Sequence, residues 1–331
     1  MESKKGKPGA RALRVLVTGA EGFVGRHLCR HILETGRRVY GTIFPGCPPE
    51  LVERVPGCEY RPGDITDASF IQSLLQWARP DWIIHLAAVS FPPEATRHPE
   101  EAWRINLCGT LNLFESVRVS RRRPRILFIG SADEYGAPAP DRIPITENSP
   151  LSPVNVYGGT KAAGDMAAAF FAERHGLDIV RVRPFNHTGP GQSPRFVCSD
   201  FARQVAEAMV SPGSKRTMSV GNLEARRDFS DVRDIVRAYV CALERGVKGE
   251  AYNIASGSAV RIGDMLAKLM QAAGVKIEIK QDPSRLRSAD VPLVVGDSTK
   301  FRQATGWKPE IPFDQTLRDL LDYWRRQLTK R

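Results

Sequence analysis

A glycine turn between an apolar run and a helical pattern constrains the fold of this chain more than any other feature. The apolar run, Leu13 to Val17, is typical of a buried parallel strand, and helical spacing of apolar residues resumes at Phe23. Between them the glycines follow the spacing Gly19-x-x-Gly22-x-x-Gly25. A strand, a glycine turn and a helix in this order favour a phosphate-binding turn over an ordinary strand–helix connection.

Each glycine of this turn has a predicted role. Gly19 permits the tight turn, Gly22 lets the backbone approach a pyrophosphate closely, and Gly25 lets the helix pack against its strand. The N-terminus of the helix offers free N–H groups and a partial positive charge to the phosphates. We therefore expect a dinucleotide cofactor to bind at this turn.

The first half of the chain alternates between predicted strands and helices. Such alternation predicts an α/β fold, a doubly wound parallel sheet of the Rossmann type. Thr66 or Asp67 can cap the second helix, which runs to about residue 78. The further strands are predicted at 38–44, 58–61, 81–88, 125–130 and 177–182, and the longer helices at 99–120 and 155–175.

Beyond residue 183 the pattern becomes irregular and rich in glycine and proline. Helices are predicted at 195–210, 231–245, 260–273 and 313–328, and short strands at 217–220, 251–254 and 276–280. We interpret this half as a smaller mixed α/β substrate domain. The predicted division is a disordered basic tail over 1–12, a Rossmann domain over 13–183 to which 228–255 returns, and a substrate domain made of 184–227 and 256–331.

Other residues at the predicted strand ends bear on the cofactor. The second strand ends in Gly41-Thr42-Ile43, without the Asp or Glu that often binds the ribose 2′-hydroxyl there, so both NADPH and NADH stay open. The fourth strand ends in small residues, Ala87 and Ala88, against which a flat cofactor can lie. His85 in that strand is interpreted as a packed core histidine. Asp64 after the third strand is either an adenine ligand or a turn former.

Three residues form a predicted catalytic group. Tyr157 and Lys161 are at positions i and i+4 of one helix and therefore share a face. We expect the ammonium of Lys161 to lower the pKa of the phenol and make it a better proton donor or acceptor near neutral pH. Ser131, at the carboxyl end of the fifth strand, can hydrogen-bond the reacting oxygen. The group predicts the proton transfer that accompanies hydride transfer at a carbonyl, with a surface Tyr–Lys pair as the alternative.

These motifs, together with Asp64-x-x-Asp67, follow the order and spacing of the extended short-chain dehydrogenase/reductases that act on nucleotide sugars, and the chain resembles that family over residues 12–328. The resemblance implies NADPH or NADH as cofactor, no metal, and a homodimer joined through the helices near 100–120 and 155–175. It further implies cofactor contacts from Gly19, Gly22, Phe23, Val24, Gly25, Asp64, Ile65, Leu86, Ala87, Ala88, Asn106, Tyr157 and Lys161.

The second half resembles the members of that family that act on GDP-sugars. The similar stretches lie at 183–192, 220–229, 287–292 and 305–309, and the whole looks most like the reductases that convert GDP-4-dehydro-6-deoxy-D-mannose to GDP-D-rhamnose. The expected partner is therefore a GDP-linked 4-keto-6-deoxy sugar. The resemblance implies that Asn186 and Val197 line the sugar-nucleotide channel, that Asn222 and Leu223 lie near the nucleotide, that Arg227 binds the diphosphate, and that Arg287 and Asp290 hold the phosphate–ribose region.

Other activities of the same fold stay open. A GDP-mannose 4,6-dehydratase needs a carboxyl acid near the serine, and Asp133 occupies the position where such enzymes carry Glu, one methylene short. Glu134 is the alternative acid if the alignment shifts by one residue. A sugar 4-epimerase is disfavoured by the missing carboxylate after the second strand. A binding protein without catalysis is disfavoured by the intact Ser131, Tyr157 and Lys161.

Composition limits the partners. The net charge of +11 favours an anionic ligand or a solvated basic surface, while the chain lacks a nucleic-acid recognition motif. Neither a membrane span nor a signal peptide is predicted, and we expect a cytoplasmic protein. The 6 cysteines have no C-x-x-C spacing, so neither a zinc site nor a disulfide framework is predicted.

Overall fold

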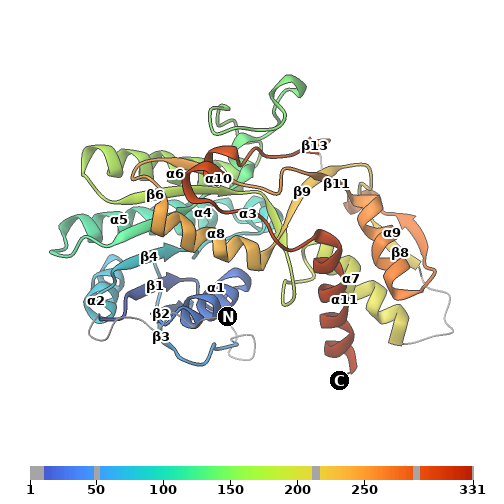
Figure 1. Cartoon of the computed structure of the whole chain (residues 1–331), viewed down its shortest axis with the longest axis horizontal. Coiled ribbons are helices and arrows are strands. Elements are labelled where there is room, and N and C mark those ends of the chain that lie inside the picture. The colour runs from blue at the N-terminus through green and yellow to red at the C-terminus, as the bar shows by residue number, and fades with distance from the viewer. Residues whose placement is uncertain (1–10, 48–52, 211–216, 286–290, 330–331) are drawn as a thin grey trace.

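The computed structural model describes residues 11–47, 53–210, 217–285 and 291–329, and a seven-stranded parallel sheet lies at its centre (Figure 1). The strand order is β10-β6-β5-β4-β1-β2-β3, which confirms the predicted fold class. The order reverses between β1 and β4, and doubly wound sheets bind ligands at the carboxyl ends of the strands at such a point. The strands are β1 (Arg14–Thr18), β2 (Arg38–Ile43), β3 (Cys58–Pro62), β4 (Trp82–His85), β5 (Arg125–Ile129), β6 (Ile179–Pro184) and β10 (Ala251–Ile254).

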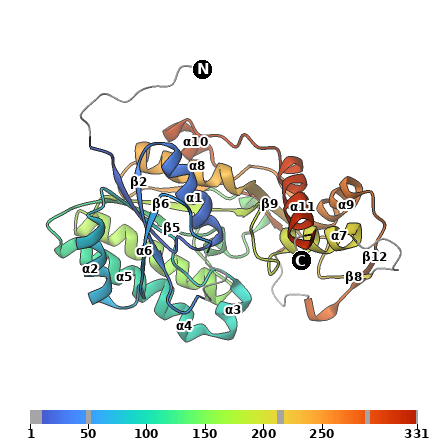
Figure 2. The same cartoon turned by 90° about the horizontal axis from the view of Figure 1, so that it is seen from below.

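Helices cover both faces of this sheet (Figure 2). Val15 and Val17 pack with α1 and α8 on one face, whereas Leu16 packs with α2 and α5 on the other. Because both faces are covered, every residue in the middle of β1 is apolar, which explains the unbroken apolar run in the sequence. The helices are α1 (Phe23–Glu34) and α8 (Val232–Arg245) on the first face, and α2 (Ala68–Ala78), α5 (Gly109–Val119) and α6 (Val156–Arg174) on the second.

The helix predicted over 99–120 contains a wider turn. The chain runs from α4 (Pro99–Trp103) through a π-helical turn, Arg104–Cys108, directly into α5. Such turns inside helices often occur at functional sites. This one carries Asn106, which is buried. A short helix that the sequence did not predict, α3 (Pro92–Arg97), precedes α4.

A second layer of structure lies to one side of the large sheet, at the right in Figures 1 and 2. Its core is formed by α7, α9 and α11, which enclose side chains such as Phe201, Met265 and Leu320. β9 pairs with β7, β11 and β13, and β8 pairs with β12. The bounds are β7 (Asn186–Thr188), α7 (Val197–Val210), β8 (Thr217–Val220), β9 (Arg226–Asp231), β11 (Ala259–Arg261), α9 (Ile262–Ala273), β12 (Glu278–Gln281), β13 (Leu293–Val294) and α11 (Phe313–Thr329). The remaining helix, α10 (Thr299–Thr305), packs on α8 and β10 of the large sheet, and 3₁₀ turns lie at Ala132–Tyr135, Pro140–Arg142 and Pro283–Arg285.

Residues 228–255 contribute α8 and β10 to the large sheet, whereas β9, whose end overlaps this range, belongs to the second layer. Except for Arg11 and Ala12, the predicted basic tail lies outside the described residues. In the described part of the chain, no helix is long and apolar enough to cross a membrane. No cluster of His, Cys, Asp or Glu among those same residues is suited to hold a metal ion.

Candidate active site

The glycine turn has the geometry expected of a phosphate-binding turn. Gly19 has φ +68°, and a Cβ there would lie 2.9 Å from the Cα of Ala87. A Cβ on Gly25 would overlap the carbonyl oxygen of Gly19, so α1 packs against the turn as closely as glycine allows. A Cβ on Gly22 would approach only the Gly19 oxygen, and no side chain caps the N-terminus of α1 at Gly22. The N–H groups of its first turn are thus suited to an anion such as a pyrophosphate.

Hydrogen bonds join this turn to the end of β4. Thr18 Oγ1 accepts the N–H of Ala87 at 3.2 Å and lies 2.7 Å from Nδ1 of His85. The other ring nitrogen of His85 lies 3.0 Å from Thr110 Oγ1, and burial, with the nearby charge of Lys161, lowers the pKa of His85 to about 3. His85 is therefore a neutral core histidine, as predicted, and it stiffens the edge formed by β1 and β4.

Asn106 connects the segment after β4 to the helix that carries the predicted catalytic pair. Its Oδ1 accepts the N–H of Val89 at 2.7 Å, and its Nδ2 donates to the carbonyl of Val89 at 3.1 Å and to Thr160 Oγ1 at 2.9 Å. Asn106 lies in the middle of the π-helical turn. It therefore fixes the spacing between the segment that follows β4 and α6.

Asp64 forms a turn, as one of its two interpretations proposed. Its Oδ1 accepts the N–H of Thr66 at 2.8 Å, and its Oδ2 lies 3.6 Å from Arg104. Asp67, rather than Thr66, caps α2 by accepting the N–H of Ser69. Ile65 is buried against the second face of the sheet. These contacts leave the predicted adenine role of Asp64 and Ile65 untested.

The structure brings Ser131, Tyr157 and Lys161 together at the carboxyl end of β5. Tyr157 lies in the first turn of α6, and the side chain of Ser131 is close enough to its phenol to lower the pKa of that phenol. Lys161, one turn later and buried, donates from Nζ to the carbonyl of Ile129 at 2.8 Å, two residues before Ser131. The charge of Asp133 also acts on the Tyr157 phenol. This edge of the sheet therefore combines a phenol, a hydroxyl, an amine and a carboxylate.

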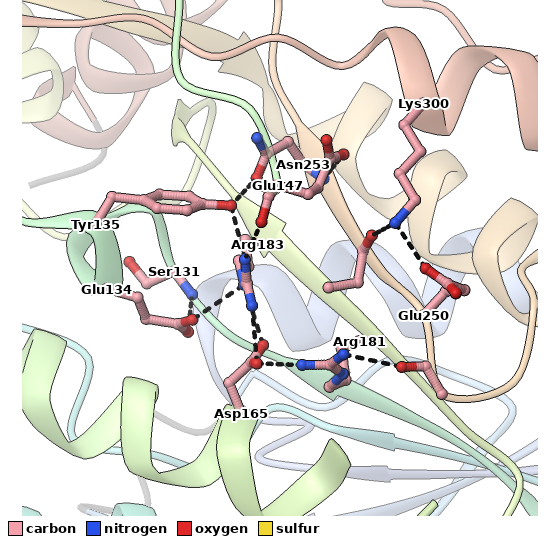
Figure 3. A network of polar contacts seen from close by, with 12 residues as sticks. Ser131, Glu134, Tyr135, Glu147, Asp165, Arg181, Arg183, Glu250, Asn253 and Lys300 are labelled. Atoms are coloured by element: carbon pink, nitrogen blue, oxygen red, sulfur yellow. Dashed lines mark hydrogen bonds and ion pairs between the residues drawn. The ribbon is translucent and has the colours of Figure 1, made fainter. Parts of the chain in front are cut away.

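A buried network of ion pairs and hydrogen bonds holds the backbone of Ser131 in place (Figure 3). Glu134 Oε1 accepts the N–H of Ser131 at 2.8 Å, and its Oε2 lies 3.3 Å from Nε of Arg183 on β6. Arg183 donates two hydrogen bonds to Asp165 of α6, at 2.9 and 3.1 Å, and a third to the hydroxyl of Tyr135 at 2.9 Å. Because Glu134 is fully buried and directed at Arg183, the alternative interpretation of Glu134 as a substrate-facing acid does not fit the structure.

Comparison with known proteins identifies the family. The profile of the family described as GDP-mannose 4,6 dehydratase matches residues 16–320. The chain belongs to this family.

Two relatives with different catalytic activities are similar to this chain over nearly its whole length. The chain is 35% identical over 316 residues to the GDP-6-deoxy-D-mannose reductase of Pseudomonas aeruginosa, covering 95% of this chain and 98% of the relative. It is 27% identical over 314 residues to a UDP-glucose 4-epimerase of Lactobacillus helveticus, covering 90% and 92%.

Solved structures agree with this assignment. The structure of RMD from Pseudomonas aeruginosa complexed with NADPH superposes with a TM-score of 0.81 at 33% identity, covering 95% of this chain and 99% of that one. The UDP-glucose 4-epimerase of Thermus thermophilus in complex with NAD gives 0.82 at 26% identity, with the same coverage. The family is thus one of NAD(P)-dependent enzymes, which confirms the predicted cofactor class.

One expectation about the catalytic pair of this family member is wrong. The pKa of Tyr157 is raised and not lowered: burial raises it most, the charges of Asp133 and Glu134 raise it further, and the side chain of Ser131 opposes them. The physical reason is that the amine bonds the carbonyl of Ile129 while two carboxylates lie near the phenol. Burial also lowers the pKa of Lys161 itself to about 8, against the opposing charge of Glu134.

The predicted substrate residues that the structure describes lie on β7, at the start of α7, and in or just before β9. Asn186, exposed on β7, follows β6 directly and pairs with Phe229 of β9, two residues from Arg227. Val197 begins α7 and is partly exposed. Asn222 accepts the N–H of Glu224 and Leu223 packs against the core of the second layer, while Arg287 and Asp290 lie outside the described residues.

Sequence reasoning missed several residues that hold this site. Thr18 bonds the segment after β4 and Thr160 bonds Asn106, and Asp165 and Arg183 hold Glu134 and thereby Ser131. One signal was available for Asp165, since it follows Lys161 by four residues and therefore shares its helical face. The threonines carry no such signal because their partners are distant in sequence.

Proposed function

We propose that this chain reduces the C4 keto group of GDP-4-dehydro-6-deoxy-D-mannose with NADPH or NADH, giving GDP-D-rhamnose. The observation that carries the proposal is the position of the Tyr157 phenol at the carboxyl end of β5, close enough to Ser131 for that side chain to lower the pKa of the phenol. The likeness to the Pseudomonas reductase, which extends over 98% of that relative, supports the choice of reaction.

In this proposal the chain's own residues handle the proton and the orientation of the sugar. The bound nicotinamide supplies the hydride that reaches C4. Ser131 donates a hydrogen bond that orients the carbonyl oxygen, and Tyr157 gives its proton to that oxygen as it becomes a hydroxyl. A phenol with a raised pKa is protonated at neutral pH, which is the form that a proton donor requires. Lys161 places its positive charge behind this pair at the end of β5.

The proposed cofactor site follows the carboxyl edge of the sheet. Gly19, Gly22 and the N-terminus of α1, with Phe23, Val24 and Gly25, would hold the pyrophosphate, since this turn has free N–H groups and no room for side chains. Leu86–Ala88 and Asn106 would border the nicotinamide side, next to Tyr157 and Lys161. Asp64 and Ile65 would lie on the adenine side, as predicted from the family.

The proposed GDP-sugar site lies between this edge and the second layer. Arg227 would bind the diphosphate because a guanidinium matches two phosphate oxygens at once. Asn186 and Val197 would line the channel, Asn222 and Leu223 would lie near the nucleotide, and Arg287 with Asp290 would hold the phosphate–ribose region. The adjacency of β7 and β9, which brings Asn186 near Arg227, supports this arrangement.

A GDP-mannose 4,6-dehydratase is the second candidate, and one observation favours it. The charge of Asp133 acts on the phenol of Tyr157, so a carboxyl group does lie beside the proposed proton donor. Asp133 is one methylene shorter than Glu, and Glu134 is held by Arg183 and by the N–H of Ser131. A proton relay is sensitive to such a displacement, which favours the reductase.

The Tyr157→Phe variant tests the reductase. Loss of the proton donor is expected to lower kcat for the GDP-linked 4-keto sugar by about 10²- to 10⁴-fold, with a much smaller change in the Kd of the reduced cofactor, to which the phenol is one contact among many. The variant Tyr323→Phe, a partly exposed tyrosine on α11, is the matched control and should keep the wild-type rate. A Tyr157→Phe enzyme that turns over at the wild-type rate contradicts the mechanism. Conversion of GDP-mannose without added reductant would identify a dehydratase instead.

We also propose a homodimer joined through the helices around α5 and α6. Three large apolar side chains on these helices and on α4 stand exposed in the single chain: Met166 is 67% exposed, Phe170 52% and Trp103 39%. Met166 and Phe170 are four residues apart and share one face of α6. An exposed apolar face of this kind is typical of a subunit interface. Light scattering on the purified protein in solution should give twice the mass of one chain.

A further inference from the structure

A carboxylate that comes from the glycine turn lies at the end of β2. Oε1 of Glu21 accepts the N–H of Phe44 at 2.9 Å, and Phe44 is the first residue after β2. The sequence has no acid at this strand end, where dinucleotide-binding domains often bind the ribose of the adenosine. Glu21 therefore places a carboxylate at the end of β2, although β2 itself contains no acidic residue there.

The position of Glu21 is fixed by the two residues that precede it. The N–H of Gly19 donates to Thr42 Oγ1 at 3.0 Å, and the N–H of Ala20 donates to the carbonyl of Thr42 at 3.2 Å. A Cβ on Gly41 would lie 2.7 Å from the Cβ of Ala20, so the turn packs directly on β2. The carboxylate consequently stays at this strand end unless the turn itself opens.

This carboxylate keeps a spare acceptor. Its second oxygen, Oε2, is shielded from water and has no hydrogen-bond partner among the described residues. The arginines of α1 do not neutralise it, because Arg26 and Arg30 both pair with Glu53. An unpartnered shielded carboxylate oxygen is costly, and a ligand that donates hydrogen bonds to it would remove that cost.

We propose that Glu21 makes this chain prefer NADH over NADPH, by accepting hydrogen bonds from the adenosine ribose of NADH and by repelling the 2′-phosphate of NADPH. A carboxylate suits a diol, whereas two anions at one site oppose each other. The family does not decide this choice, since related structures were solved with NADPH and with NAD. The inference rests on the nicotinamide cofactor of the proposed function and not on the sugar substrate.

The test is cofactor binding without any sugar present. The Kd values of NADH and NADPH are measured by isothermal titration calorimetry for the wild type, for Glu21→Gln, and for Glu34→Gln as a matched control. Glu34 lies exposed at the C-terminal end of α1, so its substitution removes the same charge far from the end of β2. We expect the wild type to bind NADH at least about tenfold more tightly than NADPH, and Glu21→Gln to reduce that ratio by about tenfold through tighter NADPH binding. Glu34→Gln should leave the ratio unchanged.

Two results would overturn the inference. One is a wild type that binds both cofactors equally or prefers NADPH. The other is a Glu21→Gln variant in which both affinities fall by the same factor, which would show that Glu21 only holds the N–H of Phe44. Thermal unfolding of the variants without cofactor establishes that they are folded. Because no substrate is present, neither result bears on the reductase, which the Tyr157→Phe assay tests separately.

Discussion

Asp165 is the residue on which the buried network behind the active site depends most. Its carboxylate forms a salt bridge with Arg183 at 2.9 Å and with Arg181, and the three side chains are 1%, 6% and 15% exposed (Figure 3). The substitution Asp165→Asn keeps the shape of the side chain and removes its charge. Arg181 and Arg183 then each lose the carboxylate of Asp165, although Arg183 keeps Glu134 and the hydroxyl of Tyr135, and Arg181 keeps the carbonyl of Gly249.

The size of the effect follows from burial. Removing one partner of a buried ion pair costs about 3–5 kcal/mol, and the remaining acceptors place this case near the lower end, about 3 kcal/mol. For a chain of 331 residues the unfolding entropy is roughly 0.7 kcal/mol per kelvin. The expected decrease in Tm is therefore about 4 °C. Removing an exposed ion pair costs only about 0–1 kcal/mol of stability, which corresponds to a decrease in Tm of no more than about 1 °C.

The assay is thermal unfolding followed by circular dichroism at pH 7. The matched control is Asp178→Asn, because Asp178 pairs with Arg125 at 3.1 Å but its side chain is 37% exposed. We expect the decrease in Tm for Asp165→Asn to exceed that for Asp178→Asn by at least about 3 °C. Equal decreases for the two variants would refute the reasoning, since burial would then make no difference to these ion pairs.

Two further predictions concern Glu134 and the glycine turn. Burial and the charge of Asp165 raise the pKa of Glu134 to about 8 from its ordinary 4.5, so the folded chain holds this proton more tightly than the unfolded chain and loses stability as pH rises through that interval. Glu134→Gln mimics the protonated acid and does not titrate. The difference in Tm, variant minus wild type, should therefore increase as pH rises from 5 to 8, and a constant difference would contradict the raised pKa. Gly25→Ala should lower both Tm and cofactor affinity, the latter by tenfold or more, because its Cβ would overlap Gly19 and lie 2.8 Å from Ala20. Gly159→Ala, whose Cβ meets Trp103 at an ordinary 3.5 Å, is the control and should raise Tm by about 1 °C; equal effects of the two substitutions would contradict the packing argument.

The Rossmann half could be predicted because its signals are local. The apolar run of β1, the glycines and the helical spacing after them lie within one stretch of sequence, and each reports a backbone geometry that the structure shows. The central strands β4 and β5 are also buried on both faces and are therefore largely apolar. Ser131 and the Tyr157–Lys161 pair could be placed for the same reason, since a strand end and one turn of helix fix where they lie.

The second layer was harder because polar residues build parts of it. β9 has the sequence Arg-Arg-Asp-Phe-Ser-Asp, which shows no apolar alternation, and the sequence analysis did not predict it. It is held instead by Asp228, which is fully buried and accepts hydrogen bonds from Ser256, Gly257 and Gly296. These partners lie 28 or more residues away, so no local pattern could show that this carboxylate is satisfied.

The same limit explains why the pKa of Tyr157 was predicted in the wrong direction and why Glu21 was overlooked. The spacing of Tyr157 and Lys161 shows that they share a helical face. However, the carbonyl that accepts the hydrogen bond of the Lys161 amine, and the carboxylates near the Tyr157 phenol, come from the neighbouring end of β5 and the turn after it. Likewise, a search for an acid along β2 cannot find one delivered from the preceding turn. The spacing of two residues in the sequence thus identifies which side chains lie together. The pKa of each side chain, however, depends on contacts that form only in the folded chain. In an active site at a sheet edge, where several strands and turns converge, those distant contacts decide the chemistry.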